Sequence, residues 1–567
     1  MSSTNAASVG DCNNKSRVKS RPIESSATIL SKNGYDLEGR SAEFLRRYTG
    51  LRGQYNLDLI GCTQQLVADE RSAVESDYAA VFKALKWTHV DFTSRLEKLV
   101  PDSRTPFKDC CTFCWYAYCP YSRRGSRMRA LYQNVLYKDS STWYMTNKQA
   151  MLRRLLLAEA TTQVAMDAGL VLPPPPVAAG SADSMSALPC VTSRCFIPPS
   201  QVYSLGREAA LVASWGILTP GTSTACYIVK PTNGLKGRGI RLYRPPKSHQ
   251  VDEAAKRLTA NDFSNFMLAE YGESQLRSSF YIVQRYIERP LLIDGRKFDL
   301  RVYLLLVPNM ACSIGCDSNP GRRGFYAFYH PGFVRLSGRQ YNRVSVDMSV
   351  HLTNSCVQQQ EQTVLGQSRR KVEPKLGDNS WTPDRVNQYF NQRFLDGLDG
   401  IPCHDWFRLT AQADMQGILA YIVARFSHQL TNSQQRSYNA FKLLGCDFLI
   451  DANLRVWLLE LNSLPSLRLV NTCHRAVKSP MQREALALSI EVVHRSANGL
   501  PVTSHSLAMR QNFRLISSAS GSGRIQSRLV RGYGQRLLAA GVTGGGCGVL
   551  ENTTPGAGGT TLTSLDE

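Results

Sequence analysis

The stretch CDFLIDANLRVWLLELNSLPS, Cys446 to Ser466, carries the strongest structural signal in the sequence. Two apolar runs flank a short Asp-Ala-Asn turn, a pattern that predicts a β-hairpin whose strands pack into a core. Three polar residues interrupt these runs: Asp447, Glu460 and Asn462. Buried carboxylates cost free energy unless a cation or a hydrogen-bond donor compensates them. The hairpin is therefore predicted to carry a site as well as part of the core.

The spacing within the hairpin groups these polar residues. Glu460 and Asn462 are two positions apart, so they share one face of a strand, and Asp447 can stand beside them on the partner strand. Their oxygens suit Mg²⁺, which binds through one or two carboxylates plus substrate phosphates. The structural alternative is an arginine partner inside the core, for which Arg301 and Arg455 are candidates. The metal is favoured because two basic stretches upstream could bind the substrate phosphates that accompany Mg²⁺.

The first basic stretch is YIVKPTNGLKGRGIRLY, Tyr227–Tyr243. A predicted strand carries Lys230 to a proline turn, a glycine-rich loop with Lys236 and Arg238 follows, and a second strand leaves the loop. Glycines let backbone amides approach phosphate oxygens, while the basic side chains supply cations. The order of strand, loop and strand excludes a Walker A loop and a Rossmann fingerprint, because both need a helix after the glycines. A basic hairpin tip in solvent is the alternative interpretation.

The second basic stretch is FYIVQRYIERPLLIDGRKFDLRVYLLL, Phe280–Leu306. Lys297, Asp299 and Arg301 alternate on one face of its second strand, because strand side chains repeat every two residues. Such charges are costly on an apolar strand unless they face a polar ligand. A solvated edge strand is the alternative. The apolar continuation VYLLLV argues against it, because this run is typical of a strand buried on both faces.

Composition narrows the class of protein. The chain has 567 residues, enough for about two to four domains, and its net charge of +22 predicts an anionic partner. No apolar run approaches the roughly 18 residues of a bilayer span, and the N-terminus lacks the apolar core of a signal peptide, so no membrane partner is expected. The 16 cysteines are scattered, which favours reduced thiols inside the cell. Zinc at 110–119 is less favoured than apolar packing.

The sequence predicts an α+β or α/β fold in five segments. These are a disordered basic N-terminus at 1–30, an N-terminal domain and Pro-rich linker at 31–195, a central subdomain at 196–290, a C-terminal subdomain at 291–500, and a disordered Ser/Gly/Arg-rich low-complexity tail at 501–567. Within the fourth segment, apolar periodicity predicts helices at 383–397, 411–430 and 481–496.

Several motifs together resemble one protein family. They are Lys230 in VKP, the GRGI loop, QRYIERPLLIDGRKFDLRVY, HLTN at 351–354 and the opening hairpin. In this order, over about residues 200–470, they resemble the tubulin tyrosine ligase-like family. The resemblance implies an ATP-grasp fold divided between 196–290 and 291–500. It also implies an enzyme that uses ATP and Mg²⁺ to join an amino acid to a tubulin tail.

The resemblance further implies roles for individual residues. The ATP phosphates would be held by Lys230, Arg238 and Gly239, and Lys236 of the same loop would supply a further cation to the nucleotide. The adenine hinge would be Gln284, Arg285, Tyr286 and Ile287, with Lys297 and Asp299 lining the rest of the nucleotide site. Mg²⁺ would be held by Asp447, Glu460 and Asn462. Asn354, with Thr353, would reach the phosphate or acyl-phosphate region, and Arg335 in GFVRLS takes the place of the arginine that engages the carboxylate of the incoming amino acid. Catalysis would therefore depend on Arg335, Asn354 and Glu460.

In this family an acceptor carboxylate attacks the γ-phosphate of ATP, and the amine of a free amino acid then attacks the acyl-phosphate. Glutamate is the amino acid expected first. Glycine and tyrosine are alternatives, because the residues after HLTN, at 355–358, do not settle the choice. The acidic tails of tubulin and microtubules suit a cationic surface. The resemblance places the protein in the cytoplasm and on the cytoskeleton, or more narrowly in a cilium, flagellum or basal body.

Two functions of other classes are alternatives. An inactive microtubule-binding relative would use the basic surface alone, but such a protein has no need of costly buried charges in the strands. Nucleic-acid binding is suggested by arginines of the tail, at Arg510, Arg514, Arg524, Arg528, Arg531 and Arg536. This function is less favoured, because a charge run is usually a solvated face and the segment has no folded RNA-binding motif.

Overall fold

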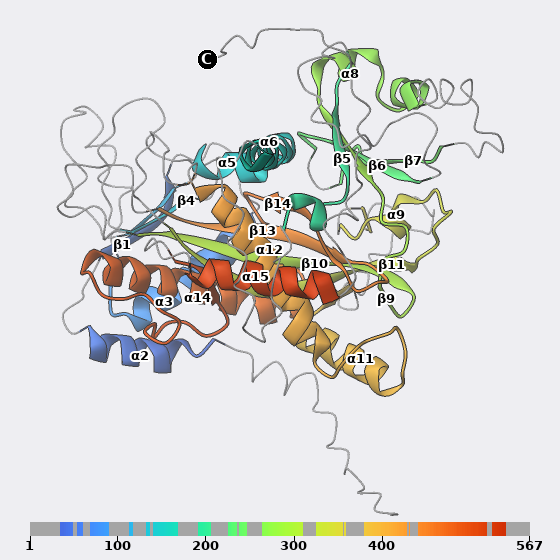
Figure 1. Cartoon of the computed structure of the whole chain (residues 1–567). Helices are drawn as coiled ribbons and strands as arrows, with labels where there is room; N and C mark the ends of the chain where they lie inside the picture. The colour runs from blue at the N-terminus through green and yellow to red at the C-terminus, as the bar shows by residue number, and fades with distance from the viewer. Residues whose placement is uncertain are drawn as a thin grey trace, which may run out of the picture. The chain divides into compact units, whose positions relative to one another are not determined.

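Figure 1 draws the elements of the computed structural model. The residues that it describes are 35–48, 54–60, 68–89, 113–116, 132–135, 140–167, 191–205, 225–234, 237–245, 263–309, 325–354, 357–358, 379–427, 430, 440–518 and 524–539. The predictions for residues 1–30, for Lys236 and for most of the cysteine cluster lie outside these residues.

Strands from distant parts of the sequence form one large mixed sheet. Its main path runs β12, β11, β10, β13, β4, β3, β1, β2, while β14, β15 and β9 pair with β13, β11 and β10 respectively. The strands that surround the opening hairpin pair antiparallel, and β4 joins β13 in parallel. The bounds are Gln54–Ile60 (β1), Thr88–His89 (β2), Phe113–Tyr116 (β3), Tyr132–Val135 (β4), Leu292–Ile293 (β9), Arg296–Pro308 (β10), Phe325–Gln340 (β11), Ser380–Trp381 (β12), Ala440–Ile450 (β13), Val456–Asn462 (β14) and Arg514–Ser517 (β15).

Helices cover both faces of this sheet (Figure 1). The helices of the two sheet regions include Leu37–Arg47 (α2), Ala68–Ala84 (α3), Ser140–Thr146 (α5), Lys148–Asp167 (α6), Glu273–Ser278 (α8), Met348–His351 (α9), Pro383–Leu395 (α11), Gln412–Arg425 (α12), Thr472–Ala497 (α14) and Arg524–Ala539 (α15), of which α8 packs with the small sheet. Side chains of α11, α12 and α15 pack on one face, and those of α3 and α14 pack on the other. No helix within the described part of the chain is long and apolar enough to cross a membrane.

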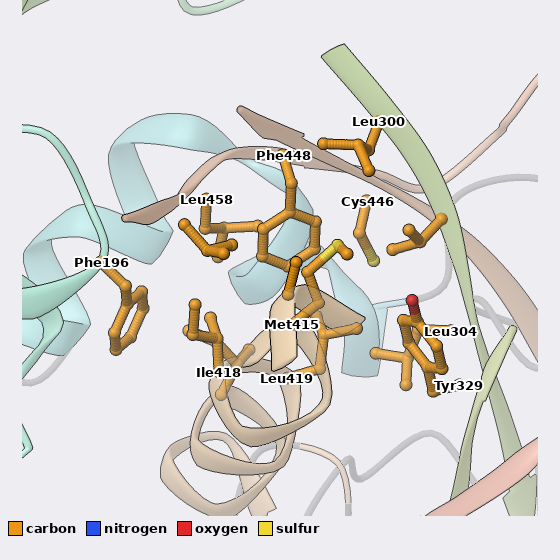
Figure 2. Close-up of a cluster of buried hydrophobic side chains, with 14 of the residues drawn as sticks. Phe196, Leu300, Leu304, Tyr329, Met415, Ile418, Leu419, Cys446, Phe448 and Leu458 are labelled. Atoms are coloured by element: carbon orange, nitrogen blue, oxygen red, sulfur yellow. The ribbon is translucent and has the colours of Figure 1, made fainter. Parts of the chain in front are cut away.

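Alternation along β10 builds both cores. Leu300 and Leu304 point toward α12, whereas Tyr303 and Leu305 point toward α14. Figure 2 shows the α12 side, where the Phe448 ring of β13 lies among side chains of β10, β14 and α12. The run 302–307 is almost fully buried, as its apolar sequence predicts. The large sheet thus has a core on each face.

A second, four-stranded antiparallel sheet has its own small core. Its order is β5, β8, β6, β7, with bounds Ser200–Tyr203 (β5), Tyr227–Pro231 (β6), Arg241–Tyr243 (β7) and Tyr281–Arg285 (β8). β6 and β7 pair on either side of the glycine-rich loop, so the predicted order of strand, loop and strand is confirmed. The opening hairpin is also confirmed as β13 and β14. The mixture of helices and sheets agrees with the α+β class.

The expected disorder beyond residue 500 is wrong for 501–517 and for α15. Glu484 of α14 accepts hydrogen bonds from the backbone N–H groups of residues 511–513, and Glu491 accepts from 508 and 509. The following chain adds β15 to β11. Tyr533 of α15 is 1% exposed and packs against Gly417 of α12. The composition of this Ser/Gly/Arg-rich segment does not predict its ordered structure, because a few apolar residues and two carboxylates distant in the sequence hold it in place.

Candidate active-site cleft

The predicted site residues meet in a cleft lined by both sheets. The small sheet contributes Lys230, Arg238 and the segment 284–287, and the large sheet contributes Lys297, Asp299, Arg335, Asp447, Glu460 and Asn462. Thr353 and Asn354 also line the cleft. Gly239 lies beside the lining, with a φ of +71°, and its carbonyl accepts a hydrogen bond from Tyr271. The structure therefore brings together the predicted residues that it describes.

Two buried lysines face the cleft without a carboxylate in direct contact among the described residues. Lys230 Nζ donates to the Gln284 side-chain oxygen at 2.8 Å, and Lys297 Nζ donates to the Tyr286 hydroxyl at 3.0 Å. Burial lowers the pKa of Lys230 to about 8 and that of Lys297 to about 7. Each lysine also lies close enough to other cations to feel their repulsion. Such a pair is suited to a polyanion, whose charge would stabilise both ammonium groups.

Asp447 is held by two arginines. Arg301 binds both oxygens of Asp447, at 2.5 Å for Oδ1 and 2.9 Å for Oδ2, and Arg335 Nη2 lies 3.1 Å from the same Oδ2. Arg335 is also bidentate to Asp299, at 2.7 Å for both bonds. Burial alone would raise the pKa of Asp447, but the two guanidinium groups hold it well below its usual range. The arginine partner considered from the sequence is thus present, and it is Arg301 rather than Arg455, which instead donates to the Cys195 carbonyl.

Glu460 has a cation partner that the sequence did not suggest. Lys148, the first residue of α6, lies 3.1 Å from Glu460 Oε2, and Asn462 donates to Glu460 Oε1 at 3.1 Å. Asn462 also lies 3.4 Å from Asp447. Lys148 stands in a helix that precedes the motif-bearing region by many residues. No local pattern marks it, so only the three-dimensional arrangement could identify it as a lining residue.

The hinge segment and the HLTN segment form the far wall. Backbone N–H groups of Arg285 and Tyr286 donate to the carbonyls of Pro199 and Cys226, which fixes the path of the hinge. The Tyr286 hydroxyl accepts from Lys297 and lies 2.8 Å from His351 Nδ1, while His351 Nε2 lies 2.9 Å from the Ser345 carbonyl. Both ring nitrogens of His351 are therefore engaged, which is typical of a structural histidine.

Other residues complete the cleft. Thr353 donates to Asp299 at 2.5 Å, so the HLTN segment is tied to β10. A Cβ built on Gly237 would lie 3.4 Å from Asn354 Oδ1, so the glycine-rich loop approaches Asn354 closely. Ile228, Ile240 and Leu449 supply apolar surface beside the hinge. A mixed wall of this kind could hold a planar apolar group next to an anionic one.

The polar group on the hairpin has the composition of a magnesium site rather than a zinc site. Asp447 and Glu460 stand opposite each other, and Asn462 contacts both. The described residues contain no group of three or more His, Cys, Asp and Glu that could hold a metal ion. Two carboxylates and one amide match the few protein ligands that Mg²⁺ takes when substrate phosphates supply the others. The residues therefore fit Mg²⁺, and their role as its ligands stays a prediction.

Comparison with known families adds an independent finding. Residues 203–498 match the family model described as "Tubulin-tyrosine ligase family". The chain belongs to this family. The match contains every predicted site residue, whereas Lys148 lies before it and α15 lies beyond it. The resemblance inferred from the motifs is therefore confirmed.

The names of individual relatives state different activities. The "Protein polyglycylase TTLL10" of Mus musculus is 32% identical over 275 residues, which cover 48% of this chain and 34% of the relative. The "Inactive polyglycylase TTLL10" of Homo sapiens is 32% identical over 276 residues, 49% of this chain and 36% of the relative. The "Probable alpha-tubulin polyglutamylase Ttll1" of Tetrahymena thermophila is 28% identical over 299 residues, 52% and 60% respectively. The chain thus matches only about one third of the length of the two polyglycylase relatives.

Proposed function

We propose that this member of the tubulin-tyrosine ligase family is an ATP-dependent ligase with an ATP-grasp fold, which joins a free amino acid to a glutamate-rich tubulin tail. One observation carries the proposal. The cleft places Lys230 and Lys297, which have no carboxylate in direct contact among the residues that the structure describes, beside the group of Asp447, Glu460 and Asn462. Cations for phosphates next to hard oxygen ligands are the parts that phosphoryl transfer requires.

The residues of the cleft divide between five tasks. Lys230, Lys297 and the glycine-rich loop with Lys236 and Arg238 would hold the phosphates of ATP, and the hinge at 284–287 would contact the adenine. Asp447, Glu460 and Asn462 would hold Mg²⁺, which neutralises negative charge on the phosphates when bound. Thr353 and Asn354 would bound the acyl-phosphate region. Arg335, whose Nε and Nη2 already bind Asp299, would bind the carboxylate of the incoming amino acid through the remaining side of its guanidinium group.

The proposed reaction has two steps. An acceptor carboxylate oxygen attacks the γ-phosphorus, a new O–P bond forms, and ADP leaves with the electrons of the broken bond. The amino group of the free amino acid then attacks the acyl carbon, phosphate leaves, and the nitrogen loses a proton to give an amide. The acceptor is already ionised at neutral pH, so the first step needs no general base. The chain's contribution is to orient the reactants and to balance charge.

Glycine and glutamate are the two amino acids to test first. Relatives named polyglycylases are 32–33% identical over 274–276 residues, which supports glycine. Relatives named polyglutamylases are 28% and 31% identical over 299 and 257 residues, which supports glutamate. Gln358, which follows HLTN, donates to the carbonyls of Ser349 and Leu352 and does not line the cleft. Its side chain therefore gives no reason to prefer either amino acid.

The net charge of +22 supports an acidic acceptor such as a tubulin tail, and with it a place on the cytoskeleton, including cilia or flagella. The second candidate function is an inactive microtubule-binding protein. The human relative named an inactive polyglycylase favours it. The two functions differ in one simple property, because only the enzyme needs to bind ATP with Mg²⁺ in the cleft.

The decisive assay combines binding and mass measurement. Purified protein is incubated with ATP, Mg²⁺, microtubules and a mixture of glycine, glutamate and tyrosine, and the tubulin tails are then weighed by mass spectrometry. We expect tails heavier by glycine or by glutamate residues. ATP and Mg²⁺ at about 100 times the dissociation constant should also stabilise the protein by about 2.7 kcal/mol. Stabilisation without added mass would point to another acceptor, and the absence of both would support the inactive relative.

The affinity for ATP should fall as the pH rises. Near pH 6.5 both lysines are already protonated, but above about pH 8 each must take up a proton when phosphates bind. The pKa values of about 7 for Lys297 and about 8 for Lys230 place the fall in affinity for ATP between roughly pH 7 and 9. Each lysine can lower this affinity by up to about tenfold per pH unit. Calorimetry with metal-free ATP in two buffers of different ionisation enthalpy should show proton uptake. An affinity that stays constant over this range would contradict the assignment of these lysines.

A further inference from the structure

Two of the register shifts in the large sheet insert one extra residue beside the cleft. In β11, His330 pairs with Tyr303, but Phe333 pairs with Arg301, so three steps on β11 match two on β10. In β14, Leu458 pairs with Phe448, but Glu460 pairs with Asp447. Each shift is a β-bulge that inserts one extra residue. Because side chains alternate with a period of two, one extra residue moves every later side chain to the opposite face.

The bulge in β11 decides where Arg335 points. In the observed register Arg335 stands opposite Asp299, in the cleft. Continuation of the earlier register would place Val334 opposite Asp299 and Arg335 opposite Phe298. Phe298 lies in the core on the α12 side, so Arg335 would enter that core without Asp299 as a partner.

Burial on either side of the bulge agrees with this reversal. Before the bulge, Phe328 packs with the α14 side and Tyr329 with the α12 side. After the bulge, the odd-numbered Phe333 packs with the α14 side and the even-numbered Val334 with the α12 side. The even and odd positions have exchanged faces, and Arg335 follows Phe333.

The bulge in β14 acts in the same way on Glu460. Without the extra residue, Glu460 would stand opposite Cys446, whose side chain lies in the α12-side core drawn in Figure 2. With it, Leu459 and Glu460 both line the cleft, and Leu461 returns to the core. Two bulges on different strands therefore supply two of the charged groups that the proposed reaction uses.

A hydrogen bond between His330 and Gly332 holds the β11 bulge in place, and we call this contact the lock. The Gly332 backbone N–H donates to His330 Nδ1 at 3.0 Å, within the buried interior. Gly332 has a φ of +60°, and a Cβ built on it would lie 1.8 Å from the Arg301 carbonyl oxygen. Only glycine fits at this approach. Burial lowers the pKa of His330 to about 3, so its imidazole stays neutral and Nδ1 can accept the bond.

We propose that His330 and Gly332 are positioning residues for Arg335. The His330 imidazole holds the bulge through the Gly332 N–H, and the bulge directs the Arg335 guanidinium into the cleft, where it meets the carboxylate of the incoming amino acid. The ligand of Arg335 rests on the proposed function, whereas the lock itself does not. Neither His330 nor Gly332 lines the cleft.

Two substitutions of one residue separate the lock from simple packing. His330→Leu removes the acceptor, whereas His330→Asn keeps one, since an asparagine oxygen can accept from the backbone N–H two residues on. With His330→Leu we expect the KM for the amino acid to rise about tenfold and the affinity for ATP to change less than about twofold. His330→Asn should restore most of the KM. Leu488→Ala, in the buried face of α14, is the control for a general loss of stability.

A second measurement reads the register without any activity. Residues directly opposite on antiparallel strands have Cα atoms about 4.5–5.5 Å apart, which a disulfide can span. The pair Asp299→Cys with Arg335→Cys should therefore crosslink, and Asp299→Cys with Val334→Cys should not. Adding His330→Leu should reduce the crosslinking yield several-fold, and His330→Asn should preserve it.

The outcomes separate the inference from the proposed function. A wild-type protein that adds no amino acid would contradict the proposed function, while the crosslinking result still decides the lock. An unchanged yield with His330→Leu, or crosslinking of the Val334→Cys pair while His330 is intact, would overturn the lock. Crosslinking of the Val334→Cys pair that appears only with His330→Leu would support it, because the earlier register places Val334 opposite Asp299. An equal rise in KM with Leu488→Ala would show that lost stability, rather than the direction of Arg335, explains the kinetic effect.

Discussion

Replacing Glu460 with glutamine should lower the rate of amino acid addition at least about a hundredfold, which corresponds to about 2.7 kcal/mol of transition-state stabilisation. Glutamine keeps the size and one oxygen but removes the charge that a magnesium ligand needs. The fold should persist, because the Glu460 side chain is 23% exposed and its ion pair with Lys148 lies at the edge of the cleft. The measurement is the initial rate at saturating ATP and Mg²⁺, beside the midpoint of thermal unfolding.

The control for this substitution is Glu273→Gln. Glu273 begins α8 of the small-sheet region and forms an exposed ion pair with Arg277. Its substitution removes one negative charge from the same chain without touching the cleft, so the rate should stay within about twofold of the wild type. If Glu460→Gln retained the wild-type rate, the hairpin could not be the metal site that the proposed function needs.

Much of the cleft was predictable because its charged residues interrupt apolar runs in the sequence. Asp447, Glu460 and Lys230 are polar residues in runs that are otherwise apolar, and the structure buries or half-buries each of them in one cleft. A charged residue in such a run needs a partner, so the pattern itself indicates a site. Helical periodicity was also informative, since α11 at Pro383–Leu395 and α12 at Gln412–Arg425 fall within the predicted helices.

The start of α14 was harder to predict. Apolar periodicity predicted the helix from residue 481, directly after Pro480, and proline disfavours a helix interior. It begins at Thr472, where Asn471 accepts the backbone N–H of His474 as an N-cap, and it runs through Pro480. Burial of the helix against the large sheet outweighs the lost backbone bond, and no local propensity scale contains that term.

The direction of side chains after the bulges was the least predictable feature. Alternation from Val456 and Leu458 places residue 460 in the core, yet Leu461 is the residue that returns there. The missed signal was the break in alternation itself and, in β11, the Pro331–Gly332 pair within a strand. The contact between Lys148 and Glu460 left no signal at all, because it joins elements far apart in the sequence.

Replacing Asp447 with alanine should destabilise the protein by about 3–5 kcal/mol, the cost typical of removing one partner from a buried ion pair. Asp447 is 3% exposed, and the side chains of Arg301 and Arg335 are each 11% exposed. Arg335 would keep Asp299, but Arg301 would lose its bidentate partner inside the sheet. Chemical denaturation should report the loss as a lower midpoint with little change in slope.

A double substitution tests why the stability is lost. If the cost comes from leaving a buried guanidinium unpaired, then Asp447→Leu combined with Arg301→Met should recover much of it, because apolar replacement of a whole buried ion pair is often neutral or stabilising. The recovered protein should still fail to bind ATP in a Mg²⁺-dependent way, since a metal ligand is gone. This result would show that Asp447 contributes to stability and to metal binding in two independent ways. If the double variant regained both properties, Asp447 would serve the fold alone, and the metal would have to depend on Glu460 and Asn462.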